Sequence, residues 1–327
     1  MSGAIVQRLA GYLSETETRS GEAIATRLSC SRAAVWKHVE SLRQLGIEVD
    51  AVAGQGYRLK EPLELLDKRL ILAGVDPAIA AKISRLDIES SIDSTNSALR
   101  RLPVRAQHTG VILAEYQSGG RGRRGRHWHS PYGRNLYLSL GWKFEQLLSE
   151  LGCLPLVVAL AAAKALARAG LEGHTVKWPN DLMLEGRKLC GCLVEIQGDI
   201  HGPCQAVIGV GVNVHMPATA ATSEIDQPWT DVHSRLPHFS RNKLAGLLLV
   251  ELFGHVELFS VSGFEPFRRD WILWDGLKDR QIDVHADSGT IHGTARGIDN
   301  RGALLLDTGK ERLKLYSGDV SLNRRNI

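Results

Sequence analysis

Apolar and polar positions alternate with different periods along the chain, and these periods divide it into three regions. In residues 1–60 the apolar side chains return every three or four positions, which is typical of amphipathic helices. The stretch IEVDAVAGQGYRL then predicts two short strands around Gly54-Gln55-Gly56, a hairpin signal. Helix, helix–turn–helix and hairpin in this order predict a winged helix-turn-helix over residues 1–64, ending in the polar, proline-containing joint EPLELLDKR.

The second region, residues 65–274, alternates short apolar runs with longer helical patterns. An alanine-rich helix is predicted from roughly Leu151 to Ala169, and residues 240–274 are predicted to be helical as well. The polar segment NDLMLEGR is expected to be a turn between two strands. The predicted strands lie in the segments SRLDIESSI, GVILAEYQ, NLYLSLGW, TVKWP, KLCGCLVEI and CQAVIGVGVNV. Such an alternation predicts a mixed α/β domain.

The last region, residues 275–327, has short strands, close turns and repeated glycine and aspartate. This pattern predicts a small all-β module, a β-barrel. The fold class expected for the whole chain is therefore α+β and multidomain, with a winged helix-turn-helix, a central α/β domain and a C-terminal barrel.

Charge narrows the possible functions. The chain has 327 residues, of which 43% are hydrophobic and 23% charged, as is ordinary for a globular protein. Its formal net charge is +4, and the segment GGRGRRGR at residues 119–126 alone contains four arginines. The remainder is thus neutral, which disfavours a broad nucleic-acid surface and makes an RNA-binding protein a distant alternative.

Cysteine usage and hydropathy indicate in which cellular compartment the protein is expected to work. The five cysteines are odd in number and show no CxxC spacing, so we expect reduced thiols, no disulfide framework and no protein-bound metal. Strand alternation would place Cys190 and Cys192 on one face as small buried residues. No signal peptide is evident, and no apolar stretch is expected to reach membrane-spanning length. These features predict a cytoplasmic protein without a membrane partner.

The helix that begins after Ser31 is the candidate DNA-reading element. In winged helices the second helix of the motif enters the major groove with its N-terminal residues. Trp36, in the same helix, is expected to fill the core. A protein-interaction module is the alternative for this region. The candidate DNA contacts are Ser31, Arg32, Lys37 and His38.

The arginine loop, residues 119–126, has the composition of a loop that closes on an anion. Glycine allows backbone N–H groups to turn toward a ligand, and arginine offers planar, permanently charged forks for phosphate or carboxylate. Like-charge repulsion and glycine entropy predict that the loop is disordered without its ligand. It is not a Walker A motif, because no GK[ST] follows. A solvated linker is the alternative, although its position between two predicted strands favours a ligand loop.

Two further clusters contain polar residues that could bind a ligand or take part in catalysis. In KWPND, residues 177–181, Pro179 ends a strand and leaves Asn180 and Asp181 at its tip, where α/β folds bind ligands. Lys188 stands where a loop becomes the next strand, so its ammonium could reach the same edge. Taken singly, Asn-Asp after proline is also a common turn and so a weak signal, and for Lys188 alone an ordinary surface lysine would be the favoured explanation.

In combination, GGRGRRGRHW, KWPND, RKLCG and GVGVNV, in this order and spacing, resemble the biotin protein ligases. The winged helix resembles that of the bifunctional subgroup, which also represses the biotin operon. The resemblance implies a class II synthetase-like core with ATP and biotin as substrates and Mg²⁺ accompanying ATP. It also implies a biotin carboxyl carrier protein as acceptor, operator DNA as partner and a homodimer when biotinyl-AMP is bound.

The resemblance assigns roles residue by residue. It implies that Lys188, Arg123 and Asp181 act in catalysis. The residues implied to bind biotin are Ser94, Thr95, Asn96, Gln117, Arg121, Gly122, Arg123, Lys188, Gly209 and Gly211. Those implied to bind ATP or the adenylate are Arg121, Arg123, Trp128, Asn180, Asp181, Asn213 and Trp229.

Two other functions remain open at this point. A transcription factor could sense a small anion with its central domain and catalyse nothing. A lipoate ligase would share the acyl-adenylate chemistry but take a different acid. Biotin-dependent exchange of pyrophosphate into ATP distinguishes both from a biotin ligase.

Overall fold

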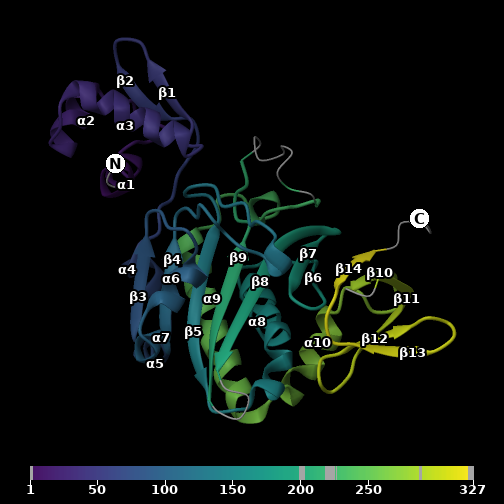
Figure 1. Ribbon diagram of the computed structural model, residues 1–327. Coiled ribbons are helices and arrows are strands. Elements are labelled where there is room, and N and C mark those ends of the chain that lie inside the picture. The colour runs from purple at the N-terminus through teal and green to yellow at the C-terminus, as the bar shows by residue number, and fades with distance from the viewer. Residues whose placement is uncertain (1–2, 199–202, 218–224, 226, 287–288, 323–327) are drawn as a thin grey trace.

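The computed structural model describes residues 3–198, 203–217, 225, 227–286 and 289–322 of the chain. Three parts follow one another in Figure 1: a small helical unit at the N-terminus, a large central sheet with helices, and a second small sheet at the C-terminus.

The N-terminal part is the predicted winged helix-turn-helix. Ser20 and Ser31 cap the second and third helices, each accepting a hydrogen bond from the backbone N–H three residues on. The hairpin pairs Val49 with Leu59 in an antiparallel ladder. Its elements are α1 (Gly3–Ala10), α2 (Gly21–Leu28), α3 (Arg32–Gln44), β1 (Val49–Val52) and β2 (Gly56–Leu59).

Trp36 departs from the prediction. Its side chain is 57% exposed, whereas Val35 and Val39 on the same helix are 1% and 0% exposed. Because a helix turns about 100° per residue, the inward stripe already contains both valines and Leu42, and Trp36 points away from it. The tryptophan therefore lies on the outer face of α3, not in the core.

The central part is built on a seven-stranded sheet of order β3-β4-β5-β9-β8-β7-β6. Among the strands that the structure describes here, β3 and β4 pair in parallel and the other neighbours are antiparallel. The strands are β3 (Arg85–Glu89), β4 (Gly110–Ala114), β5 (Leu136–Phe144), β6 (His174–Lys177), β7 (Asp181–Leu184), β8 (Arg187–Gly198) and β9 (Cys204–Val212).

Helices cover both faces of this sheet. On one face α8 (Leu154–Arg168) and α9 (Arg241–Ser262) pack together and share the main hydrophobic core with the strands (Figure 1). On the other face α6 (Thr95–Arg101) packs on Ile112 and Val207 in a smaller cluster. The shorter helices of this part are α4 (Lys68–Ala73), α5 (Pro77–Ala80), α7 (Val104–Gln107) and α10 (Arg268–Trp274).

Three expectations about these elements are corrected. Within NDLMLEGR, residues Asp181–Leu184 form β7, because Leu182 and Leu184 alternate inward with polar neighbours. The predicted helix over 240–274 breaks at Gly263, which has a φ of +63°. Two helices, Leu148–Arg168 and Arg241–Ser262, are long and apolar enough to cross a membrane by length and composition. Most of each apolar window is buried inside the fold, so these are core helices.

The C-terminal part is a five-stranded antiparallel sheet of order β13-β12-β11-β10-β14. A hydrogen bond connects it to the central part: the indole N–H of Trp178 donates to the Gly302 carbonyl at 2.9 Å. Its strands are β10 (Gln281–Ala286), β11 (Gly289–Ile298), β12 (Leu304–Asp307), β13 (Arg312–Leu315) and β14 (Asp319–Leu322).

Candidate functional site

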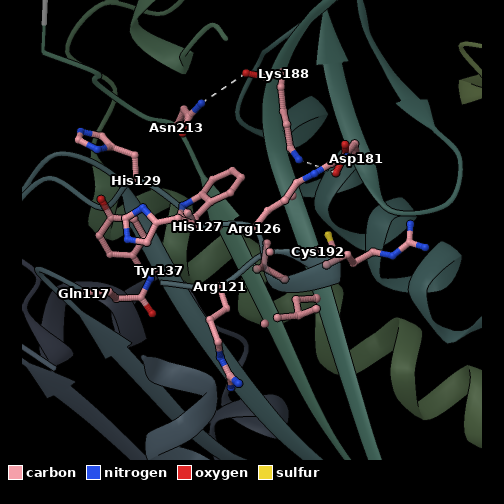
Figure 2. Close-up of a pocket in the computed structure, with 18 of the residues that line it drawn as sticks. Gln117, Arg121, Arg126, His127, His129, Tyr137, Asp181, Lys188, Cys192 and Asn213 are labelled. Carbon is pink, nitrogen blue, oxygen red and sulfur yellow. Dashed lines mark hydrogen bonds and ion pairs between the residues drawn. The ribbon is translucent and has the colours of Figure 1, made fainter. Parts of the chain in front are cut away.

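A cavity of about 430 Å³ opens over β5, β9 and β8, between α6 and the arginine loop. Figure 2 shows side chains from widely separated segments around it, among them Gln117, Asp181 and Lys188. Every residue that the sequence analysis assigned to biotin, ATP or catalysis lines this cavity.

Glycines form the floor of the cavity. A Cβ at Gly209 would collide with the side-chain amide of Asn96, and one at Gly211 would lie 2.7 Å from the Trp128 indole. Gly191 on the neighbouring strand has the same function, since its Cβ would lie 2.9 Å from Trp128. Two adjacent strands thus leave a flat strip of backbone on which a ligand can lie.

One end of the cavity carries buried neutral hydrogen-bonding groups. The N–H of Thr95 donates to Gln117 Oε1 at 2.9 Å, and Gln117 Nε2 donates to Ser130 Oγ at 3.1 Å. Asn96 Nδ2 donates to Glu195 Oε2 at 2.8 Å. Ser94 precedes α6 as its N-cap but makes no side-chain bond to the helix. Such a set suits a small polar ring with both donors and acceptors.

The other end of the cavity is cationic. Lys188 Nζ lies 2.9 Å from Asp181 Oδ1 (Figure 2). On the other side of this carboxylate, Lys177 Nζ lies 3.9 Å from Asp181 Oδ2. Burial lowers the pKa of Lys177 from its usual value. Two lysines therefore share one carboxylate, which leaves positive charge available to an anionic ligand.

The arginine loop lies over the cationic end. Its backbone closes on itself where Gly122 N–H donates to the Arg126 carbonyl at 2.7 Å. Arg123 donates to Asn180 Oδ1 at 3.1 Å, and burial lowers its pKa. Arg121 lies 3.2 Å from Glu195. The first two predicted loop arginines thus point toward opposite ends of the cavity.

The loop is a folded turn, whereas the sequence predicts disorder without a ligand. The physical reason is a set of acceptors from the C-terminal sheet. Arg126 lies 2.7 Å from Asp319 Oδ2, and Arg123 donates to the Gly318 carbonyl at 3.4 Å. These contacts offset the repulsion among the guanidinium groups.

Trp229 also lines the cavity. Its segment runs beside Lys188, whose N–H donates to the Pro228 carbonyl and whose carbonyl accepts from Thr230 N–H, both at 2.9 Å. Asn213 bridges the two segments by donating to the Lys188 carbonyl at 3.3 Å (Figure 2). The Trp128 indole N–H has no hydrogen-bond partner within the described part of the chain.

Comparison with known proteins agrees with this geometry. A family model described as biotin/lipoate A/B protein ligase matches residues 89–213, an HTH domain matches residues 5–58, and a biotin protein ligase C-terminal domain matches residues 279–323. The bifunctional ligase/repressor BirA of Escherichia coli is 38% identical over 96% of each chain. That of Bacillus subtilis is 31% identical over 93% of each chain.

The chain belongs to the bifunctional biotin ligase/repressor family.

Solved structures of biotin ligases share the fold. A biotin protein ligase from Aquifex aeolicus in complex with biotin and ATP matches with a TM-score of 0.62 and 25% identity. The match covers 73% of this ligase and 99% of that one.

The predicted DNA contacts of this ligase lie on one helix but do not all face outward. Arg32 and Lys37 are exposed on α3, as expected. His38 is half-buried, because residues three apart share a helix face and His38 follows the inward Val35 by three positions. The hydroxyl of Ser31 accepts from Ala34 N–H at 3.2 Å and so caps the helix.

The sequence analysis of this ligase did not assign Gly191, Arg126 and Asp319, which line the cavity, or Lys177, which pairs with Asp181. Gly191 had a signal, because it is the glycine of the KLCGC strand segment and lies opposite Gly211 in the ladder. Lys177 begins the KWPND motif, but only its neighbours were singled out. Arg126 ends the arginine loop. Asp319 had no local signal, since nothing in SGDVSL indicates that it meets the loop.

Proposed function

We propose that this chain joins biotin to ATP to form biotinyl-5′-AMP and then transfers the biotinyl group to a lysine of a carboxylase's biotin carrier domain. With the adenylate bound, it would also repress transcription of biotin synthesis genes. The observation that carries the proposal is the shape of the cavity, in which a glycine floor joins a neutral polar end to a cationic end.

Biotin would lie along the floor. Its ureido ring has donors and acceptors that match the neutral end, where Ser94, Thr95, Asn96 and Gln117 are buried. Its aliphatic chain would cross Gly209 and Gly211, and its carboxylate would reach Lys188.

In the first step a carboxylate oxygen of biotin attacks the α-phosphorus of ATP. A new P–O bond forms, the bond to the leaving pyrophosphate breaks, and no redox change occurs. Both reactants are anions, so catalysis is mainly positioning and electrostatic stabilisation. Lys188 would bridge the carboxylate and the α-phosphate, while Arg121 and Arg123 hold oxygens on either side.

Mg²⁺ would arrive with the triphosphate. The carboxylates lining the cavity, Asp181 and Asp319, are already paired with Lys188 and Arg126. This donor set fits an ion held chiefly by phosphate oxygens and water.

In the second step the acceptor's lysine amine attacks the acyl carbonyl. The C–N bond forms, the bond to AMP breaks, and the amine loses a proton. Asp181 would orient the amine or accept that proton. Trp128 and Trp229 would cover the adenine, with Asn180 and Asn213 beside the nucleotide. The closed loop would shield the mixed anhydride from water.

The same closure would control repression. If the ordered loop region forms part of a homodimer surface, the adenylate acts as corepressor, and the dimer presents two α3 helices to a two-fold operator. We expect the reaction and the repression to take place in the cytoplasm.

One assay tests the enzymatic half. Exchange of labelled pyrophosphate into ATP should require biotin and should not be supported by lipoate in its place. Exchange without biotin, or no exchange at all, would refute the proposed activity and favour a sensor. Native mass measured with and without biotin and ATP then tests adenylate retention and dimerisation together.

A further inference from the structure

A second cavity, of about 500 Å³, lies where the winged helix joins the central part. Its walls come from the linker at Glu61–Glu64, from the residues before β5, and from the segment that leads into α9. It shares no lining residue with the biotin cavity. We call it the joint cavity. The linker that lines it is the chain between β2 and α4 in Figure 1.

Arg134 is the main charged group of the joint cavity. Its side chain is 4% exposed, yet its carboxylate partner is Glu61 of the linker, at 3.0 Å and 44% exposed. Its Nη1 also donates to His215 Nδ1 at 3.1 Å, while its Nε has no hydrogen-bond partner among the described residues. A buried guanidinium is therefore neutralised by one displaceable carboxylate and lacks an acceptor at one nitrogen.

The imidazole of His215 is a neutral wall group of the cavity. Because arginine cannot accept a hydrogen bond, His215 Nδ1 must accept, which is the neutral form of the ring. Burial first, and then the Arg134 cation, lowers the pKa of His215. His215 stacks on His233 with ring centroids 4.8 Å apart. Pro62, Pro237 and Phe239 add apolar surface.

The second linker carboxylate is not displaceable in the same way. Glu64 accepts from Ser240 Oγ and from the backbone N–H of Arg241, both at 2.6 Å, at the start of α9. Asn242 Nδ2 donates to it at 2.9 Å. Glu64 is therefore held in place at the cavity wall, and its carboxylate disfavours a ligand with two negative charges.

The geometry points to the joint cavity as a binding site for a monocarboxylate with an apolar body, whose carboxylate replaces Glu61 on Arg134. One negative charge restores neutrality when Glu61 leaves, and a carboxylate matches the planar guanidinium fork. The apolar body would lie against the prolines, Phe239 and the stacked imidazoles. Binding would release the Glu61–Arg134 contact, one of several that hold the linker to the central part.

Calorimetric titration with octanoate tests this site in the full chain. Excess biotin is added first, so that octanoate cannot enter the biotin cavity unnoticed. We expect one octanoate per chain, no heat of binding for 1-octanol, and much weaker binding of acetate. Equal binding of 1-octanol, or no octanoate binding, would overturn the proposal, as would octanoate that competes with biotin.

Two variants locate the site. Glu61→Gln removes the competing charge but leaves Arg134, so octanoate should bind tighter, on the order of tenfold. Arg134→Met should abolish binding. Glu265→Gln, an exposed glutamate paired with Arg268, is the matched control and should change nothing. If Arg134→Met does not fold, Glu61→Gln still decides, because unchanged affinity in that variant contradicts displacement of Glu61.

Discussion

Two ion-paired clusters in this molecule use the same chemistry in opposite ways. Arg241 and Glu115 lie 2.6 Å apart and are 3% and 0% exposed, with the other Glu115 oxygen bound to Leu66 N–H at 2.6 Å. Lys188 and Asp181 lie 2.9 Å apart, but each is 13% exposed and opens on the biotin cavity. The first cluster is saturated and holds the fold together. The second retains unsatisfied charge, which a substrate can use.

The largest effect is expected from breaking the saturated cluster. Arg241→Met leaves Glu115 buried without its counter-charge, which should lower the free energy of unfolding by about 3–5 kcal/mol. Urea denaturation measures the loss. Adding Glu115→Gln to this variant should restore part of the stability, because the uncompensated charge is gone. A loss below about 1 kcal/mol in the single variant would contradict the structural role of the pair.

Lys188→Ala should have the opposite effect: it should reduce the catalytic activity and leave the stability of the fold nearly unchanged. We expect biotin-dependent pyrophosphate exchange to fall by about a hundredfold or more, which corresponds to about 3 kcal/mol of lost transition-state stabilisation. Stability in urea should change by less than about 1 kcal/mol. Lys68→Ala, an exposed lysine at the start of α4, is the control. Exchange at the level of the unmodified chain would refute the role given to Lys188.

Only part of this contrast is visible in the sequence. Asp181 and Lys188 flank one short hairpin, so local pattern alone brings them to the same sheet edge. Gly209 and Gly211 alternate along one strand, which predicts a shared face. By contrast, Asp319 meets Arg126 across 193 positions of the chain, and no local pattern encodes such a contact.

The elements of the fold divide in the same way, into those that local sequence signals predict and those that they do not. Caps, hairpins and helical stripes predicted the winged helix and most central strands, because those signals are local. Two misassignments arose where composition misled: NDLMLEGR is polar enough to resemble a turn, and a tryptophan is usually placed in a core. In NDLMLEGR the stronger signal was the alternation of Leu182 and Leu184, which indicates a strand. In α3 the stronger signal was the inward stripe, which Val35 and Val39 already fill, so that Trp36 must face outward.

The open cluster also depends on the side-chain-free glycine strip beside it. Gly209→Ala places a methyl group against the Asn96 amide, and overpacking of this kind costs about 1–3 kcal/mol. We expect most of that cost in biotin affinity, measured as Kd by calorimetry. Gly254→Ala in α9 meets nothing within 4 Å and should leave biotin binding unchanged. Equal biotin affinity in the Gly209 variant would mean that the ligand does not use this strip.

The smallest effect is expected from an exposed pair of the same kind. Arg101 donates to both oxygens of Asp93 at 2.7 and 2.8 Å, but the side chains are 58% and 50% exposed. These hydrogen bonds lower the pKa of Asp93 to about 2. Because the folded pKa lies below the ordinary value of 3.8, the pair stabilises the fold above pH 3.8, and that contribution is lost as the pH falls through about 2.

Solvent screening should keep that contribution below about 1 kcal/mol at neutral pH. Asp93→Asn should therefore change urea stability little at pH 7 and remove its part of the pH dependence between pH 4 and pH 2. A loss as large as that of Arg241→Met would show that hydrogen-bond geometry, rather than burial, separates structural ion pairs from the rest. Since Asp93 and Arg101 have bidentate geometry without burial, this variant isolates burial as the variable that distinguishes the saturated cluster from a surface contact.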